Sequence, residues 1–217
     1  MTPQRRLMLG LLLTACAGFI DVVGFIELGG YFTSFMSGNT TQLGAAIGGI
    51  EQMVALPASL VAMFFLGGFA GSFLGYRSRR WGPSMVLALV ISTLAVALAL
   101  RLNGWPTTQA MLVLAAGAGA QNATLPFSGS GARLGATFVT GTLFAAGQDL
   151  AAAILGKAPP WRWLQHLQVW ASLLLGGLAG AALYGQFGLE AILLPGLVYL
   201  VMLVAFTLKS PADLPRP

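Results

Sequence analysis

Charge is scarce in this sequence, and the side chains that usually carry catalysis or bind metals are scarcer still. Only 8% of the 217 residues are charged, against roughly 25% in a soluble domain. Cys16 is the single cysteine and His166 the single histidine, which excludes an intrachain disulfide and leaves too few ligands for a typical metal centre. The motifs HExxH, GxSxG and GxxxxGK(S/T) are absent as well. The sequence therefore predicts a protein that is not an enzyme and needs no cofactor or metal.

Long apolar runs take the place of charge. Hydrophobic residues make up 57% of the chain, and its mean hydropathy is +0.81. Several charge-free runs reach the ~18–20 residues needed to cross a bilayer, at 52–76, 81–100, 102–132, 167–189 and 191–208. The basic residues lie at the ends of these runs and form no patch, which argues against a nucleic-acid partner. We predict an all-α polytopic membrane protein whose partner is the lipid bilayer, with residues 1–217 as a single transmembrane domain.

The runs predict six spanning helices and two shorter ones. The spanning helices are expected at about 7–28, 56–76, 84–100, 107–127, 166–186 and 189–208, and the short ones at about 38–50 and 141–156. At ~1.5 Å per residue, the first short helix covers about 20 Å of a ~30 Å hydrocarbon core. Arg5, Arg6 and Cys16 also resemble a lipoprotein signal peptide, whose cleavage would leave Cys16 lipidated. We favour a spanning helix, because apolar sequence continues past Cys16 to Ile26.

Each short helix is preceded by a polar, glycine-containing motif. The first polar motif is Phe35-Met36-Ser37-Gly38-Asn39-Thr40-Thr41, and the second is Phe138-Val139-Thr140-Gly141-Thr142. The free N–H groups and positive dipole end of a helix N-terminus suit an anion, and glycine lets a ligand approach the backbone. Ordinary N-capping explains the same residue types equally well. The candidate solute-binding residues are Ser37, Gly38, Asn39, Thr40, Thr140, Gly141 and Thr142.

Four further polar residues lie inside apolar segments. Asp21 and Asp149 are carboxylates at predicted membrane depth, where charge is costly and often functional. A carboxyl group in apolar surroundings can titrate near neutral pH, so both are candidates for proton coupling; each can equally fix the fold through hydrogen bonds to a helix N-terminus. Gln121 and Asn122 are candidates to contact the solute or to join helices by hydrogen bonds.

The two halves of the chain resemble each other in order. Leu66-Gly67-Gly68-Phe69-Ala70-Gly71 recurs as Leu175-Gly176-Gly177-Leu178-Ala179-Gly180, the polar motifs recur, and Ala17-Gly18 recurs as Ala118-Gly119. We predict repeat one at about 1–103, repeat two at about 104–209 and a polar tail at 210–217. Six crossings place every basic residue except Arg101 on the cytoplasmic side, which the positive-inside rule favours. Three crossings per unit make the repeats inverted, an architecture that recurs in transporters.

Two motifs resemble a known family. Ala17-Gly18-Phe19-Ile20-Asp21-Val22-Val23-Gly24-Phe25 and Met36-Ser37-Gly38-Asn39-Thr40 are similar to the AGFxDxxGF and M(S/T)GNT elements of the YoaK-like family of uncharacterised bacterial inner-membrane proteins. The resemblance covers nearly the whole chain by length and segment order. It implies a bacterial inner-membrane protein with about six crossings, draws Asp21, Gly38 and Asn39 into the family pattern, and implies no substrate.

These patterns favour a secondary transporter for a small polar or anionic solute, coupled to protons and with both termini cytoplasmic. A channel of the same architecture is one alternative. A structural or assembly protein that binds partner helices is another, because the GxxxG spacing of Gly67, Gly71 and Gly75 suits close helix packing. The glycine-rich faces also allow a homo-oligomer.

Overall fold

In the computed structural model, residues 3–49, 53–78, 80–125 and 139–208 are described, and all regular structure in these ranges is helical. The first four helices are α1 (Pro3–Glu27), α2 (Met36–Ile47), α3 (Ala55–Arg77) and α4 (Gly82–Leu102). They are followed by α5 (Thr107–Gln121), α6 (Val139–Ile154), α7 (Arg162–Phe187), the 3₁₀ helix η2 (Gly188–Ile192) and α8 (Leu193–Thr207).

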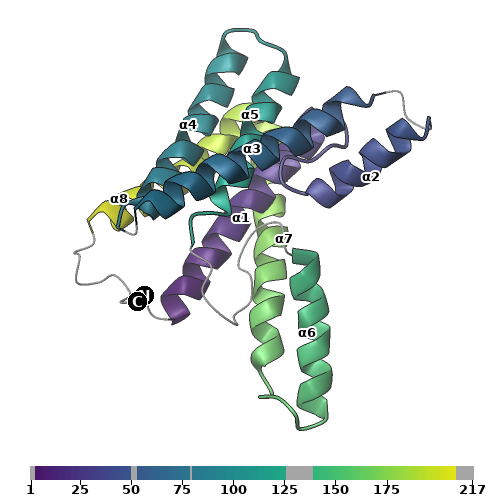
Figure 1. The fold of residues 1–217 in the computed structure, drawn as a ribbon, viewed down its shortest axis with the longest axis vertical. Helices are drawn as coiled ribbons and strands as arrows, with labels where there is room; N and C mark the ends of the chain where they lie inside the picture. Colours follow the sequence, from purple (N-terminus) through teal and green to yellow (C-terminus); the bar gives the residue numbers. More distant parts are fainter. Residues whose placement is uncertain (1–2, 50–52, 79, 126–138, 209–217) are drawn as a thin grey trace.

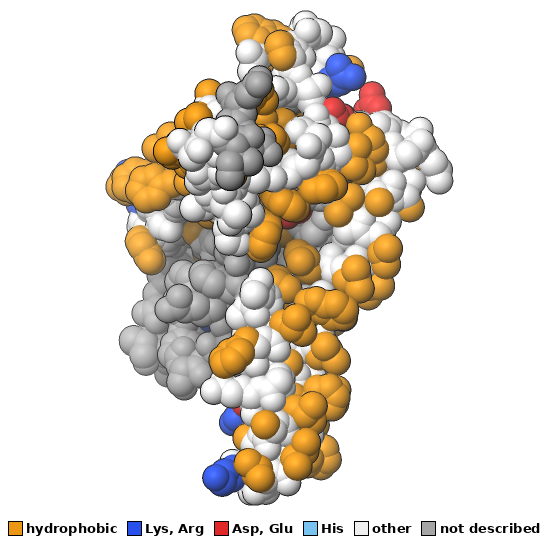
Figure 2. Space-filling model, turned by 90° about the vertical axis from the view of Figure 1, so that its right-hand side faces the viewer, with side chains coloured by type: hydrophobic (Ala, Val, Ile, Leu, Met, Phe, Trp, Pro, Cys, Tyr) orange, Lys and Arg blue, Asp and Glu red, His pale blue; other side chains and the backbone are white. Residues whose placement is uncertain are grey.

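The long helices have the length and apolarity of membrane spans. Within the described ranges, four continuous helical stretches qualify: Gln4–Glu27, Ala55–Arg77, Gly82–Leu102 and Arg162–Thr207, the last of which contains α7, η2 and α8. By contrast, α2 has 12 residues and α6 has 16, which correspond to about 18 and 24 Å. Hydrophobic side chains are spread along the whole length of the face in Figure 2, and the basic side chains visible there lie mainly toward its two ends. The chain is a polytopic α-helical membrane protein.

The helices form a central group with two arms (Figure 1). In the central group, α1 packs on α7, α5 packs on α3 and α4, and α4 packs on α8. The short helix α2 lies on α3, and the short helix α6 lies on α7. Figure 1 shows α2 and α6 each beginning near the middle of the molecule and running outward in different directions. The core lies among α1, α4, α5 and α8, where side chains such as Val23, Leu87, Met111 and Tyr199 are fully buried.

Glycines set the closest helix contacts. A Cβ atom added at Gly67 would overlap the carbonyl oxygen of Ala116, and one at Gly71 would lie 2.7 Å from the Cα of Ala120. The backbones of α3 and α5 therefore touch, as the GxxxG spacing predicts. The glycine face of α3 is thus filled by a helix of the same chain.

The same contacts recur between α7, which repeats the α3 sequence, and α1, whose sequence is repeated in α5. The glycines of α7 meet α1 at residues that correspond, in the alignment of the two halves, to those by which α3 meets α5. The matched pairs are Gly67–Ala116 with Gly176–Ala15, Gly71–Ala120 with Gly180–Phe19, and Gly119–Phe64 with Gly18–Leu173. The sequence similarity between the halves is therefore accompanied by a matching set of backbone contacts.

Helix bounds agree with the expected ones to within a few residues, except for α5 and the start of α8. We expected α5 to continue to residue 127, but it ends at Gln121. Asn122, Ala123 and Thr124 instead form tight turns, with their N–H groups donating to Gly119, Ala120 and Gln121. The Asn122 amide also donates to the Ala118 carbonyl (3.0 Å), and side chains that bond nearby backbone compete with helix continuation. The expected last helix is divided into η2 and α8.

Candidate functional site

Asp21 holds the loop that leads into α2. It lies on α1, and its Oδ1 accepts hydrogen bonds from the backbone N–H of Ser34 (2.7 Å) and the hydroxyl of Thr33 (3.2 Å). Thr33 and Ser34 are both buried. A carboxylate that accepts a backbone N–H at membrane depth satisfies a group that lipid could not. Asp21 therefore attaches the loop to the spanning helix.

Asn39 holds the same loop from the opposite end. Its Nδ2 donates to the carbonyl oxygen of Phe32 (2.7 Å), and its Oδ1 accepts the Phe32 N–H (3.0 Å). Asn39 is fully buried, so its amide pairs with the loop backbone as a neighbouring strand would. Gln42 adds a hydrogen bond from its Nε2 to the Gly30 carbonyl (2.9 Å).

Two glycines and three aromatic rings complete this arrangement. A Cβ at Gly24 would lie 2.5 Å from the Thr33 methyl, and one at Gly38 would lie 2.6 Å from the Phe35 ring. The Phe32 ring lies 5.2 Å from the ring centroid of Phe25 and 5.2 Å from that of Phe35. We call Asp21, Phe32, Thr33, Ser34 and Asn39 the α1–α2 clasp. The two family-like motifs thus supply the two sides of one clasp.

The remaining residues of the first polar motif lie in the first turns of α2. Ser37 and Thr40 are exposed, and the Thr40 hydroxyl donates to the Met36 carbonyl (2.7 Å). The N-cap of α2 is Phe35, which makes no side-chain capping bond. Neither Ser37 nor Asn39 is therefore an N-cap, and Gly38 packs beneath aromatic rings rather than beside open space.

The second polar motif is more open. Thr140 and Gly141 are exposed in the first turn of α6, and a Cβ at Gly141 would meet nothing within 4 Å. Thr142 is buried, and its hydroxyl donates to the Val139 carbonyl (2.7 Å). Phe138 and the glycine-rich segment before it lie outside the described residues.

Gln121 joins three helices. Its Nε2 donates to the Leu13 carbonyl on α1 (2.7 Å), and its Oε1 accepts the Tyr199 hydroxyl from α8 (2.7 Å). Both side chains are buried, so the amide is fully used in holding the core. Asn122, at the end of α5, is half-buried and bonds to Ala118.

Asp149 lies on the arm formed by α6 and α7. Its Oδ2 accepts the Arg162 Nε–H (2.7 Å) and lies 3.3 Å from the His166 Nε2. The hydrogen bond from Arg162 lowers the pKa of the Asp149 carboxyl below its usual value. The ion pair therefore favours the ionised carboxylate and ties α6 to the first turns of α7.

The structure brings only some of the candidates together. Asp21 and Asn39 share the clasp, while Asp149 belongs to the α6–α7 arm. Within the described residues no hydrogen bond links the two polar motifs, and no group of three His, Cys, Asp or Glu residues could hold a metal ion. The sequence interpretation missed Thr33 and Ser34, although two hydroxyl residues in a short loop after a lone membrane carboxylate were a usable signal.

Comparison with known proteins gives a family and no function. Residues 9–205 match the family described as "Protein of unknown function (DUF1275)". The chain is 34% identical over 207 residues to a UPF0700 transmembrane protein of Rhizobium meliloti (strain 1021), covering 93% of this chain and 88% of that protein. No solved structure matches. The resemblance to an uncharacterised bacterial membrane family is confirmed, and the chain belongs to the DUF1275 family of transmembrane proteins.

Proposed function

We propose that this protein is a secondary transporter for a small polar or anionic solute, which binds between the starts of α2 and α6. One observation carries the proposal: two helices too short to span begin near the middle of the molecule, in halves whose backbone contacts correspond residue by residue. Interrupted or partial helices in related halves recur at transporter binding sites. The proposal assigns no chemical conversion to the protein.

The two halves are proposed to be inverted repeats of three crossings and one short helix. Figure 1 places the start of α1, the end of α3 and the end of α8 toward the same side of the molecule. Arg77 is the last residue of α3 and Arg80 follows it on that side, whereas Arg101 lies in the last turn of α4. With the positive-inside rule, this arrangement favours an inner membrane with the N- and C-termini cytoplasmic.

The solute would meet the exposed parts of the two polar motifs. Ser37 and Thr40 on α2, and Thr140 and Gly141 on α6, are exposed and lie in the first turns of their helices. Each first turn adds partial positive charge, which favours a carboxylate or another anion. Asn39, Thr142 and Gln121 are already committed to the chain's own backbone or core, so we assign them to shaping the site.

Asp21 is proposed to couple protons to the movement of α2. Its Oδ1 accepts both bonds from the loop, and a carboxylate accepts hydrogen bonds more strongly than a neutral acid. Protonation would weaken the hold of α1 on Thr33 and Ser34, and α2 packs on α3 at its other side. Asp149 is less suited to this role, because its ion pair with Arg162 resists protonation.

Proton-coupled uptake tests the proposal directly. The full chain would be placed in liposomes that contain the pH dye pyranine, and acetate, lactate, phosphate and sulfate would be added outside. We expect at least one anion to move protons inward with the wild type and at least tenfold more slowly with Asp21→Asn. Glu190→Gln removes an exposed carboxylate of η2 and serves as the matched control. Equal rates in Asp21→Asn and wild type would remove the proton role.

The other interpretations make different predictions in the same assay. A channel would give flux that is linear in solute concentration and indifferent to the proton gradient. A structural or assembly protein would move none of the anions and would instead co-purify with a membrane partner in fixed ratio. Asp149→Asn decides between the two acids, because the proposal expects it to keep proton-dependent uptake.

A further inference from the structure

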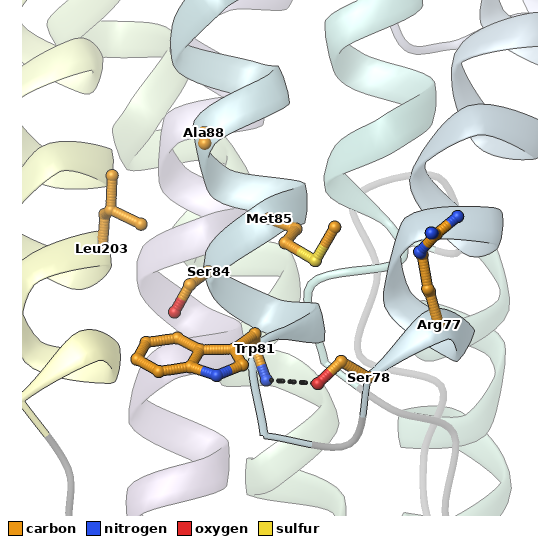
Figure 3. Close-up of a pocket in the computed structure, with 7 residues that line it drawn as sticks. All are labelled: Arg77, Ser78, Trp81, Ser84, Met85, Ala88 and Leu203. Atoms are coloured by element: carbon orange, nitrogen blue, oxygen red, sulfur yellow. Dashed lines mark hydrogen bonds between the residues drawn. The ribbon is translucent and has the colours of Figure 1, made fainter.

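A cavity of about 520 Å³ opens beside the first turn of α4 and shares no residue with the clasp or the polar motifs (Figure 3). Its polar end is formed by Arg77 and Ser78 at the end of α3, and by Trp81 and Ser84 at the start of α4. Its other wall consists of Met85 and Ala88 on α4 and Leu203 on α8. Two consecutive helices, α3 and α4, and the distant helix α8 therefore build it.

The turn between α3 and α4 fixes the polar end. A Cβ at Gly82 would overlap the Gly75 carbonyl oxygen, so the start of α4 lies directly on the end of α3. The Ser78 hydroxyl accepts the Trp81 N–H (3.0 Å), and the Ser78 carbonyl accepts the Gly82 N–H (2.7 Å). These bonds hold Arg77 next to the first turn of α4.

The buried hydroxyl of Ser84 is the observation that indicates a ligand. It is 5% exposed, and its hydroxyl has no hydrogen-bond partner in the structure described here. A buried hydroxyl without a partner is unfavourable unless something else in the cavity bonds to it. Ser84 also lies in the first turn of α4, where the helix dipole favours negative charge.

The charge around the cavity is positive. Among the described residues, no carboxylate lies within ion-pairing distance of Arg77, and the Arg80 guanidinium lies 4.7 Å from the Trp81 ring centroid. The described acidic residues Asp21, Glu27, Asp149 and Glu190 lie on α1, α6 and η2 and do not line the cavity. Arg77 and Ser84 lie on opposite sides of the first turn of α4 (Figure 3), so an anionic group large enough to reach both would meet a guanidinium and a hydroxyl, with no carboxylate among the described residues that line the cavity.

The apolar wall indicates that the anion belongs to a lipid rather than to a free solute. Met85, Ala88 and Leu203 continue from Ser84 along two helices that belong to continuous apolar stretches. Trp81 is 42% exposed at the rim, as is typical of aromatic residues at the membrane interface. A free phosphate would gain nothing from this wall, whereas an acyl chain would. We propose that the cavity binds an anionic phospholipid, with its headgroup extending between Arg77 and Ser84 and an acyl chain along Met85, Ala88 and Leu203.

Native mass spectrometry of the detergent-purified full chain tests the site. We expect phosphatidylglycerol to bind about tenfold more tightly than phosphatidylcholine, and Arg77→Gln to reduce phosphatidylglycerol affinity about tenfold. Ser84→Ala should weaken it about three- to tenfold through the lost hydrogen bond to a charged group. Arg101→Gln, the same charge change at the opposite end of α4, should leave binding unchanged.

Three outcomes would overturn the proposal. The first is equal affinity for the two lipids, and the second is wild-type phosphatidylglycerol binding by Arg77→Gln. The third is displacement of phosphatidylglycerol by millimolar inorganic phosphate, with the same dependence on Arg77 and Ser84, which would assign the site to a soluble anion. Thermal melting without added lipid checks that the variants fold. If Ser84→Ala melts at a lower temperature than the wild type, the test rests on Arg77→Gln alone, because Arg77 is exposed.

Discussion

Asn39→Ala tests whether the clasp holds α2 in place. The substitution removes both hydrogen bonds to Phe32 and leaves that residue's N–H and carbonyl without their partner. Each unpaired buried group costs about 1–3 kcal/mol, and Phe32 is half-buried. We therefore expect a loss of roughly 2–4 kcal/mol in the free energy of unfolding. Asn39→Asp keeps the acceptor for the Phe32 N–H but places a carboxylate oxygen against the Phe32 carbonyl at a fully buried position, so it should cost at least as much.

The assay is reversible unfolding in mixed micelles followed by circular dichroism, with hydrogen exchange of the loop amides as a local readout. Thr40→Ala is the matched control, because its exposed hydroxyl bonds only to the same helix and should change stability by less than ~0.5 kcal/mol. Interhelical hydrogen bonds in membranes average as little as ~0.6 kcal/mol each. A loss below about 1 kcal/mol for Asn39→Ala, with unchanged exchange at Ser34, would therefore refute the clasp as a stabilising unit.

Two further substitutions test the packing. Gly67→Ala places a methyl group on the Ala116 carbonyl oxygen and should lower stability by about 1–3 kcal/mol, whereas Gly147→Ala, which meets nothing within 4 Å, should be neutral or slightly stabilising. Tyr199→Phe leaves the buried Gln121 Oε1 without its donor and should cost about 1–3 kcal/mol. Thermal melting in detergent measures both, and equal melting of the two glycine variants would contradict the close contact between α3 and α5.

The positions of the helices could be read from the sequence because charge and polarity mark their ends. The expected spans 56–76 and 84–100 compare with Ala55–Arg77 and Gly82–Leu102 in the structure, and the glycine spacing of α3 correctly indicated a close helix partner. The end of α5 could not be placed, since Asn122 ends the helix through a local side-chain bond that apolar composition does not reveal. The position of a helix follows from the pattern of apolar residues, whereas the end of α5 depends on one side-chain hydrogen bond.

The candidate site was harder to predict, because the sequence shows that a residue is polar but not which group it bonds to. Asp21 was predicted to couple protons and Asn39 to bind solute, and in the structure both bond to the backbone of the loop between α1 and α2. That partnership depends on Gly29 and Gly30, whose positive φ values of 63° and 114° turn the chain back after α1. The chemistry of Asp21 suits a solute, a proton or a backbone N–H equally well, and only the course of the loop selects among them.

The cavity at Ser84 could not be predicted from the sequence either. Nothing local distinguishes Ser84 from other serines in apolar helices, because the cavity exists only where α3, α4 and α8 meet. The signals that the sequence did contain were Arg77 and Trp81 at a helix junction, which suit any membrane interface. Long-range packing turned a common interfacial pattern into an apolar cavity with one polar end.

The two halves match in their glycine contacts but differ in their polar groups, and this difference bears on the proposed mechanism. In the alignment of the halves, the neutral Asn122 takes the place of Asp21, and Thr142 takes the place of Asn39. Only the first half therefore combines a carboxylate on a spanning helix with hydrogen bonds to the loop before a short helix. If the halves exchange roles during transport, as inverted repeats do, they differ in charge. Asp21 in the first half can gain a proton, whereas Asn122 in the second half cannot. We accordingly expect one coupled proton per cycle, with the α2 arm as the side on which it is carried.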